Sequence, residues 1–149
     1  MPASPLLTAK KAHKGQMRDN GDPYISHPVR TAERLHQLVV HPDPELIAAA
    51  YLHDTLEDTS LHHNEIVRLY GKRVAFLVKS VTKKSKKYYA RKNTNYLEQL
   101  ANSARIDPAV AFLKMADRLD NISDMAAWSQ KKQSHYLKNS LSLFLTLLK

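Results

Sequence analysis

The sequence has no cysteine among its 149 residues and contains only three glycines. Without cysteine, disulfide bonds and thiolate ligands are excluded, so any metal site must use histidine or carboxylate side chains. β-branched residues do not alternate with polar ones, and the hydrophobic periodicity is helical throughout. No apolar run reaches the length of a membrane span, and the first residues lack the apolar core of a signal peptide. These absences predict a cytoplasmic protein without a membrane partner.

Positive charge is in excess, with 23 Lys and Arg against 14 Asp and Glu and a formal net charge of +9. An excess of this sign favours anionic partners such as nucleotides, phosphates or nucleic acid. The basic residues are concentrated in residues 10–14 and 83–92. A solvated face is the alternative interpretation of either cluster.

The length suits one domain, and no repeat or linker divides the chain, so residues 1–149 are predicted to form a single all-α domain. Asp43 and Pro44 are typical of a helix start, and Gly71 of a helix end. The predicted helices cover residues 6–18, 29–40, 44–53, 61–70, 74–81, 96–106, 109–122 and 134–148. Residues 82–93 are predicted to form a basic loop or the start of an exposed helix.

An unusual concentration of acid follows the apolar segment of residues 46–52. Residues 53–58 read His-Asp-Thr-Leu-Glu-Asp. Acids are disfavoured at a helix C-terminus, and carboxylates crowded beside apolar residues raise desolvation and like-charge costs. If the helix continues, the His and Glu, and likewise the two Asp, share a face because each pair is four residues apart. A bound metal cation is the simplest explanation, and a solvated helix end is the alternative.

Two further polar residues, Asp117 and His27, are candidates for the same metal site. Asp117 sits among apolar helix positions and therefore needs a partner, which is either a metal or a buried Lys or Arg. His27 precedes Pro28 at a predicted helix entrance, where a capping or surface role is the alternative. Combined with His53 and Asp54, they form a mixed nitrogen and oxygen set suited to Mn, Fe, Zn or another divalent ion. Such an ion lowers the pKa of bound water and holds phosphoryl oxygens, as phosphoester hydrolysis requires.

These residues resemble a known pattern. His27, the His53-Asp54 doublet and Asp117 match the H…HD…D pattern of the HD phosphohydrolase superfamily. The flanking sequence resembles the RelA/SpoT-type alarmone hydrolase domain, in the family's order over residues 8–125. The matching segments are residues 12–18 (AHKGQMR), 21–28 (GDPYISHP), 49–59 (AAYLHDTLEDT), 78–83 (VKSVTK) and 114–121 (KMADRLDN).

The resemblance implies an all-α HD-domain helical bundle of the stand-alone small alarmone hydrolase kind, similar to the metazoan SpoT homologues, with no room for a synthetase region. It implies one Mn²⁺ ion, or another divalent metal, and removal of the 3′-pyrophosphate from (p)ppGpp to give GDP or GTP and pyrophosphate. The expected partner is a small nucleotide, with no specific nucleic acid. The expected assembly is a monomer or a small homo-oligomer.

Carried over position by position, the resemblance assigns metal ligands, an acidic pair that activates or positions the attacking water, and contacts to the nucleotide. The implied metal ligands are His27, His53, Asp54 and Asp117, the acidic pair is Glu57 and Asp58, and the nucleotide contacts are Arg18 and Asn121.

Two departures from the family pattern bear on the substrate. Asp19 stands where a second basic residue is common, and Asp120 stands where His or Tyr is frequent. Neither is expected to touch the metal ligands. The Asp19 departure and the basic segment of residues 83–92 leave open the same chemistry on an adenosine alarmone, the 2′-phosphate of NADPH or a pyrophosphorylated RNA end. An inactive nucleotide- or RNA-binding module is the alternative from another class.

Overall fold

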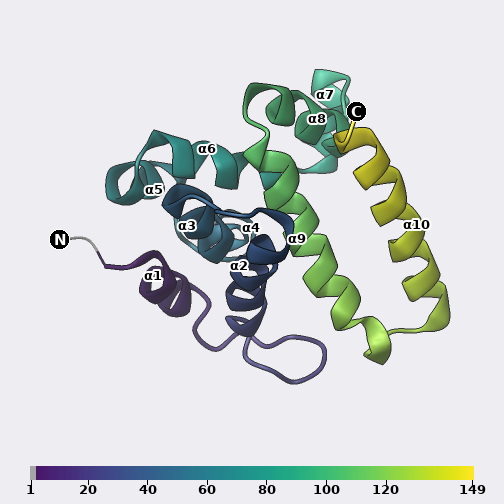
Figure 1. Cartoon of the computed structure of the whole chain (residues 1–149), viewed down its shortest axis with the longest axis horizontal. Coiled ribbons are helices and arrows are strands. Elements are labelled where there is room, and N and C mark those ends of the chain that lie inside the picture. Colours follow the sequence, from purple (N-terminus) through teal and green to yellow (C-terminus); the bar gives the residue numbers. More distant parts are fainter. Residues whose placement is uncertain (1–2) are drawn as a thin grey trace.

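A computed structural model describes residues 3–149, and this range contains helices and no β-strand, which confirms the all-α fold class (Figure 1). Residues 1 and 2, part of the predicted domain of residues 1–149, lie outside the described residues. The helices are α1 (Pro5–Ala12), α2 (Ser26–Leu38), α3 (Pro44–Leu52), α4 (Thr55–Asp58), α5 (His63–Tyr70), α6 (Lys72–Val81), α7 (Lys86–Lys92), α8 (Tyr96–Ile106), α9 (Ala109–Ser123) and α10 (Gln130–Leu147), with a 3₁₀ turn at Met125–Ala127.

Local sequence signals set several helix boundaries where they were predicted. The Asp43 carboxylate accepts a hydrogen bond from the Leu46 N–H at 2.9 Å, and Pro44 occupies the first turn of α3. Gly71 ends α5 and precedes α6 with a φ of 95°. Helix α8 has the predicted bounds. Capping and turn chemistry therefore account for much of the element order.

Other boundaries differ from the prediction. The first helix ends at Ala12 rather than near residue 18, and the chain then turns through Gly15, which adopts a φ of 84°. Helix α2 starts at Ser26, earlier than predicted. Residues 82–93 contain the short helix α7, which Ser85 caps by accepting a hydrogen bond from the Tyr88 N–H at 3.1 Å.

The acidic segment does not continue the helix before it. Helix α3 ends at Leu52, and α4 is a separate single turn from Thr55 to Asp58. The Thr55 hydroxyl donates to the Leu52 carbonyl oxygen at 2.7 Å, a local bond of the kind that competes with helical pairing. The conditional expectation that residues 53–58 form two rows on one continuous helix is therefore wrong.

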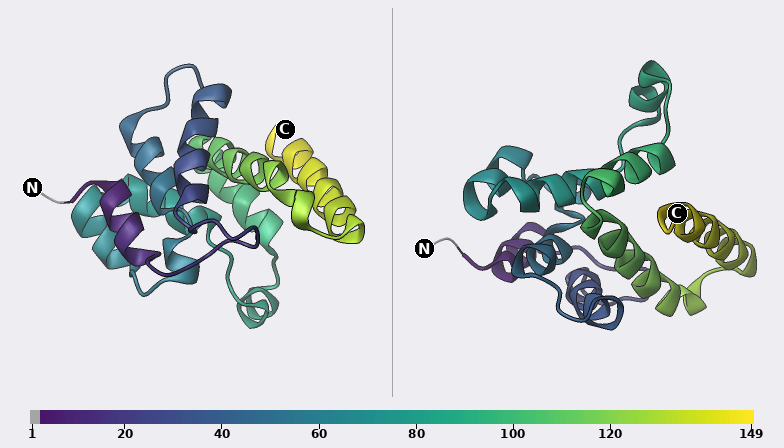
Figure 2. Two further views of the ribbon diagram at one scale, coloured as in Figure 1. Left: turned by 90° about the horizontal axis from the view of Figure 1, so that it is seen from below. Right: turned by 45° about the horizontal axis from the view of Figure 1, so that its top comes forward.

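Four helices meet in the core. Helix α2 packs along α9 and against α3, while α3 also packs on α6 and α1 (Figures 1 and 2). Leu35, Leu52, Leu77 and Leu113, one from each of α2, α3, α6 and α9, are completely buried. Helix α10 runs beside α9 and contacts α8. Among the described residues, no helix combines the length and apolarity needed to cross a membrane.

The Gly71 conformation gives a first prediction. With φ 95° and ψ 169°, Gly71 occupies a backbone region that is essentially restricted to glycine. A methyl group there meets no atom within 4 Å, so the penalty for alanine comes from the backbone alone. We expect Gly71→Ala to lower the free energy of unfolding by about 1–3 kcal/mol, as measured by urea denaturation.

Asn93→Gly is the matched control for Gly71→Ala. Asn93 ends α7 in the left-handed region, with a φ of 49°, and glycine adopts that conformation without strain. This variant should remain within about 0.5 kcal/mol of the wild type. Equal stability of Gly71→Ala and wild type would contradict the assignment of strain to Gly71.

Candidate metal centre and active site

Four side chains from three parts of the chain converge between α2, α3, α4 and α9. His27 comes from α2, Asp117 from α9, and His53 and Asp54 from the break between α3 and α4. One ligand atom from each lies within 4.8 Å of the others. His27 Nε2 lies 2.9 Å from Asp117 Oδ1 and 3.2 Å from His53 Nε2, and His53 Nε2 lies 3.0 Å from Asp54 Oδ2. The structure thus brings together all four residues that were predicted as metal ligands.

Each imidazole makes a hydrogen bond through Nδ1, and this bond directs its Nε2 towards the centre. His27 Nδ1 lies 2.7 Å from Asp120 Oδ2, and His53 Nδ1 lies 2.7 Å from the Ala50 carbonyl oxygen. Because both oxygens only accept hydrogen bonds, each Nδ1 is assigned the proton. The neutral rings then direct two Nε2 lone pairs at each other and at two carboxylates. A centre made only of acceptors requires positive charge, and a divalent cation suits this N₂O₂ set.

The electrostatic field at the centre favours positive charge. Burial alone would lower the pKa of His53, but the Asp54 and Asp117 carboxylates hold it well above its ordinary value. The pKa of His27 is also raised, because its contacts with Asp117 and Asp120 outweigh its burial. Burial also opposes ionisation of Asp54, yet His53 lowers its pKa to about 2. Protonated imidazoles or a bound metal ion would each supply the positive charge that these carboxylates require.

Asp117 uses its two oxygens differently. Oδ1 faces the histidines, while Oδ2 accepts a hydrogen bond from Lys114 Nζ at 2.9 Å. Both side chains are largely buried, at 9% and 13% exposure, and Asp117 raises the Lys114 pKa against the effect of burial. The buried Asp–Lys pair considered from the sequence therefore exists, but it lies within one helix and leaves the other oxygen free to serve a metal.

Tyr24 is a further member of the site that the sequence reasoning did not single out. Its hydroxyl donates to Asp54 Oδ2 at 2.7 Å. Burial, followed by the nearby Asp54 carboxylate, raises the Tyr24 pKa, so the phenol keeps its proton and remains a donor. It restrains the Asp54 carboxylate from outside the ligand cluster. Its position inside the GDPYISHP segment was the available signal.

Glu57 and Asp58, the predicted acidic pair, lie on α4 beside the ligand cluster. Their carboxylate oxygens and one from Asp54 lie within 4.8 Å of one another. Glu57 Oε1 accepts a hydrogen bond from the Lys83 N–H. Both residues are exposed as whole residues, but their carboxyl groups border a pocket, and this partial burial raises the pKa of each. A raised pKa makes a carboxylate a better proton acceptor.

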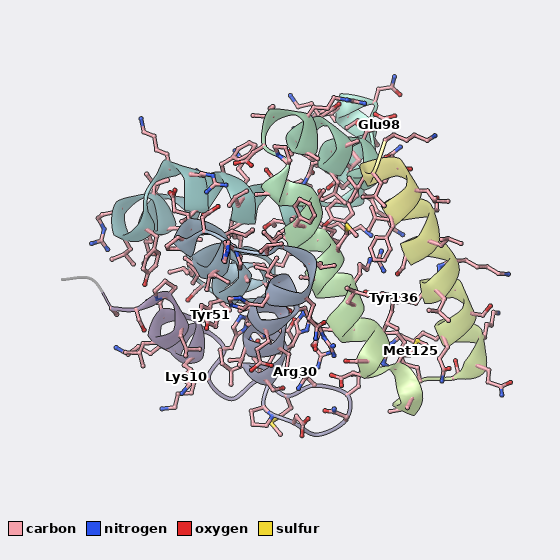
Figure 3. All side chains as sticks on the ribbon, viewed as in Figure 1. Lys10, Arg30, Tyr51, Glu98, Met125 and Tyr136 are labelled. Carbon is pink, nitrogen blue, oxygen red and sulfur yellow. The ribbon has the colours of Figure 1, made fainter. Side chains whose placement is uncertain are left out.

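The centre lies in a pocket of about 270 Å³, which adjoins a second pocket of about 330 Å³. Tyr24, Asn121 and Tyr136 line both pockets. Figure 3 shows Tyr136 reaching from α10 towards α9, where its hydroxyl accepts a hydrogen bond from Asn121 Nδ2 at 2.9 Å. Cationic side chains line the inner pocket at Lys83, Lys114 and Arg118, and the outer pocket at Arg18 and Lys132. The two pockets together offer an anionic ligand a candidate metal centre and several cationic side chains, among which Arg18 is paired with Asp124.

The two predicted nucleotide contacts lie together in the outer pocket. Arg18 Nη2 donates to Asn121 Oδ1 at 3.1 Å, and Arg18 Nε donates to Asp124 Oδ2 at 3.1 Å. Trp128 and Tyr136 form an edge-to-face pair with centroids 5.2 Å apart beside them. Sequence reasoning missed this aromatic pair because α10 returns to α9 through tertiary packing alone.

The two family departures occupy different environments. The Asp19 side chain is 74% exposed and lines the outer pocket, where its Oδ2 lies 3.7 Å from Lys132 Nζ. Asp120 is completely buried and contacts His27 directly. The expectation that Asp120 does not touch the metal ligands is wrong. Asp120 lies three residues after Asp117, so both project from the same side of α9 towards α2.

Comparisons with known proteins agree with this geometry. The HD domain family matches residues 6–148. A guanosine-3′,5′-bis(diphosphate) 3′-pyrophosphohydrolase of Aquifex aeolicus is 41% identical over 140 residues, covering 93% of this chain and 20% of that protein. A probable chloroplastic GTP diphosphokinase of Arabidopsis thaliana is 35% identical over 146 residues, covering 93% of this chain and 20% of that protein. The chain thus spans about a fifth of the length of these curated relatives.

For one solved structure, the similarity covers most of that structure's chain. That structure is described as a metazoan ortholog of SpoT that hydrolyzes ppGpp, and it superposes with a TM-score of 0.80 at 26% identity, covering 99% of this chain and 87% of that one. With a family match over nearly its whole length and this similarity to SpoT/RelA-type proteins, the chain belongs to the HD-domain family.

Proposed function

We propose that this chain is a Mn²⁺-dependent hydrolase that removes the 3′-pyrophosphate of (p)ppGpp to give GDP or GTP and pyrophosphate. The observation that carries the proposal is the cluster of inward-facing acceptors with an acidic pair beside it, in a pocket that Lys83, Lys114 and Arg118 also line. The name of the Aquifex relative and the description of the metazoan structure specify the same substrate for those proteins.

The residues divide into three groups by position. His27, His53, Asp54 and Asp117 would hold the metal, which when bound supplies Lewis acidity to water and phosphoryl oxygens. Glu57 and Asp58 would accept the proton of the attacking water. Arg18 and Asn121 would hold the nucleotide, and Lys83 and Arg118, which line the inner pocket, would supply positive charge to the leaving pyrophosphate.

The direct test is hydrolysis of ppGpp by the purified chain. With Mn²⁺ present, we expect release of pyrophosphate and GDP in equal amounts. Ion-exchange chromatography measures both products. Treatment with EDTA should abolish the release, and added Mn²⁺ should restore it. Absence of pyrophosphate release with Mn²⁺ and with each of the other common divalent metals would contradict the proposal.

A second candidate keeps the chemistry and changes the nucleotide. It is favoured by Asp124, which neutralises Arg18 inside the outer pocket at 3.1 Å. The rates with ppGpp, an adenosine alarmone, NADPH and a pyrophosphorylated RNA end, measured under the same conditions, decide between the candidates. Tight, salt-dependent RNA binding without any hydrolysis would instead indicate the binding module. The monomeric or small homo-oligomeric state, the cytoplasmic location and the lack of nucleic-acid and membrane partners stay predictions from the sequence.

A further inference from the structure

The two histidines of the centre are oriented by different means. His53 directs Nδ1 at a main-chain carbonyl, that of Ala50, which the end of α3 supplies. His27 directs Nδ1 at the side chain of Asp120, at 2.7 Å. The orientation of His27 therefore depends on the identity of one residue, whereas that of His53 follows from the backbone.

Asp120 is itself held in place by cations. Arg30 Nε donates to Asp120 Oδ1 at 2.8 Å, and Arg30 Nη2 donates to Oδ2 at 3.2 Å, which makes a two-point contact across α2 and α9. Figure 3 shows Arg30 between these two helices. Arg34 Nε lies 3.8 Å from Oδ1. These cations offset the cost of burying the Asp120 charge and fix the plane of the carboxylate.

The network continues to the outer pocket. Arg30 Nη2 also donates to Asp124 Oδ2 at 2.5 Å, and the same oxygen accepts a hydrogen bond from Arg18 Nε at 3.1 Å. A continuous chain of charged groups thus joins a candidate nucleotide contact to a candidate metal ligand.

We propose that Asp120, clamped by Arg30, is a positioning residue that sets the affinity of the metal centre by holding His27. Its carboxylate keeps the proton on Nδ1 and the lone pair of Nε2 directed at the other three ligands. This inference rests on the proposed metal site. Without the carboxylate, the ring can rotate or adopt the other tautomer, and either change removes one ligand from the set. Loss of such an outer partner commonly weakens metal binding by about 10–100-fold.

The test is the dissociation constant for Mn²⁺, measured by isothermal titration calorimetry on the full chain. Asp120→Leu removes the acceptor and keeps the branching of the side chain, and we expect its Kd to rise by about 10–100-fold. Asp120→Asn keeps one acceptor oxygen and should give an intermediate Kd. Arg30→Gln leaves Asp120 in place but unclamped, and should give a smaller rise. Because the Arg30 side chain is 28% exposed, Arg30→Gln should fold and test the inference even if the buried position 120 does not tolerate leucine.

Asp107→Asn is the matched control. Asp107 also pairs with an arginine, Arg73 Nε at 2.9 Å, but it lies at the start of α9, outside both pockets. This variant should lose stability without any change in Kd. An unchanged Kd in Arg30→Gln and the Asp120 variants, or an equal rise in Asp107→Asn, would overturn the inference. If the wild type binds no Mn²⁺, the proposed metal site fails and the inference fails with it.

Discussion

Asp117→Asn is expected to abolish both Mn²⁺ binding and hydrolysis and to destabilise the metal-free protein. The substitution removes the negative charge that faces the two histidines and leaves Lys114 without its partner. Breaking a buried ion pair on one side commonly costs about 3–5 kcal/mol. Urea denaturation in the presence of EDTA measures the loss of stability without a contribution from metal, and calorimetry measures the loss of binding.

A double variant separates the two effects of Asp117. In Lys114→Met with Asp117→Asn, the unpaired cation is gone, so much of the lost stability should return. Metal binding should remain absent, because the ligand is still missing. Retention of wild-type Mn²⁺ affinity by Asp117→Asn would refute the ligand assignment, whatever happens to stability.

Glu57→Gln is expected to lower the turnover rate by about 10²–10⁴-fold, the usual contribution of a positioned acid or base. The amide keeps an oxygen that can accept the Lys83 N–H but cannot take a proton from water. Since Glu57 is not among the four converging ligands, the Kd for Mn²⁺ should stay unchanged. Asp58→Asn should lower the turnover rate in the same way and leave the Kd for Mn²⁺ unchanged. Glu98→Gln, an exposed acid on α8, is the control and should keep the wild-type rate. A full rate in Glu57→Gln would remove Glu57 from the mechanism.

The raised pKa of Glu57 also fixes the sign of two pH effects. Burial makes the folded state bind this proton more tightly than the unfolded state does. Its contribution to stability therefore falls as pH rises from the ordinary glutamate pKa through the raised one. Above that window, Glu57→Gln should be more stable than wild type, and below it the difference should vanish. Hydrolysis by the wild type should fall as pH drops, because a protonated Glu57 cannot accept a proton from water.

The sequence predicted features that depend on short-range chemistry. The cap at Asp43, the stop at Gly71 and the bounds of α8 follow from rules that involve only neighbouring residues. The convergence of His27, the His-Asp doublet and Asp117 was also predicted, because acids and histidines in apolar surroundings need partners. The helix boundaries have a local cause, whereas the convergence joins residues up to 90 positions apart and was predicted from residue type and from the resemblance to the H…HD…D pattern.

Some features that depend on distant partners were missed. The helix predicted over residues 44–53 ends at Leu52, but only the fold shows that residues 55–58 form a separate helical turn. The burial of Asp120 follows from its position three residues after Asp117, but its role depends on Arg30, which lies 90 residues earlier. Tyr136 reaches the pocket because α10 folds back, and nothing near it in the sequence indicates this.

The placement of the proposed metal ligands has a consequence for the stability of the folded chain. His27 and His53 are 26 residues apart, and Asp117 follows His53 by 64. An ion held by these three closes long loops and so acts as a reversible cross-link between distant segments. At a free Mn²⁺ concentration 100-fold above the Kd, selective binding to the folded state adds about 2.7 kcal/mol to its stability. Resistance to proteolysis should therefore rise with the supply of metal, so that the abundance of the protein is coupled to the ion that its proposed reaction requires.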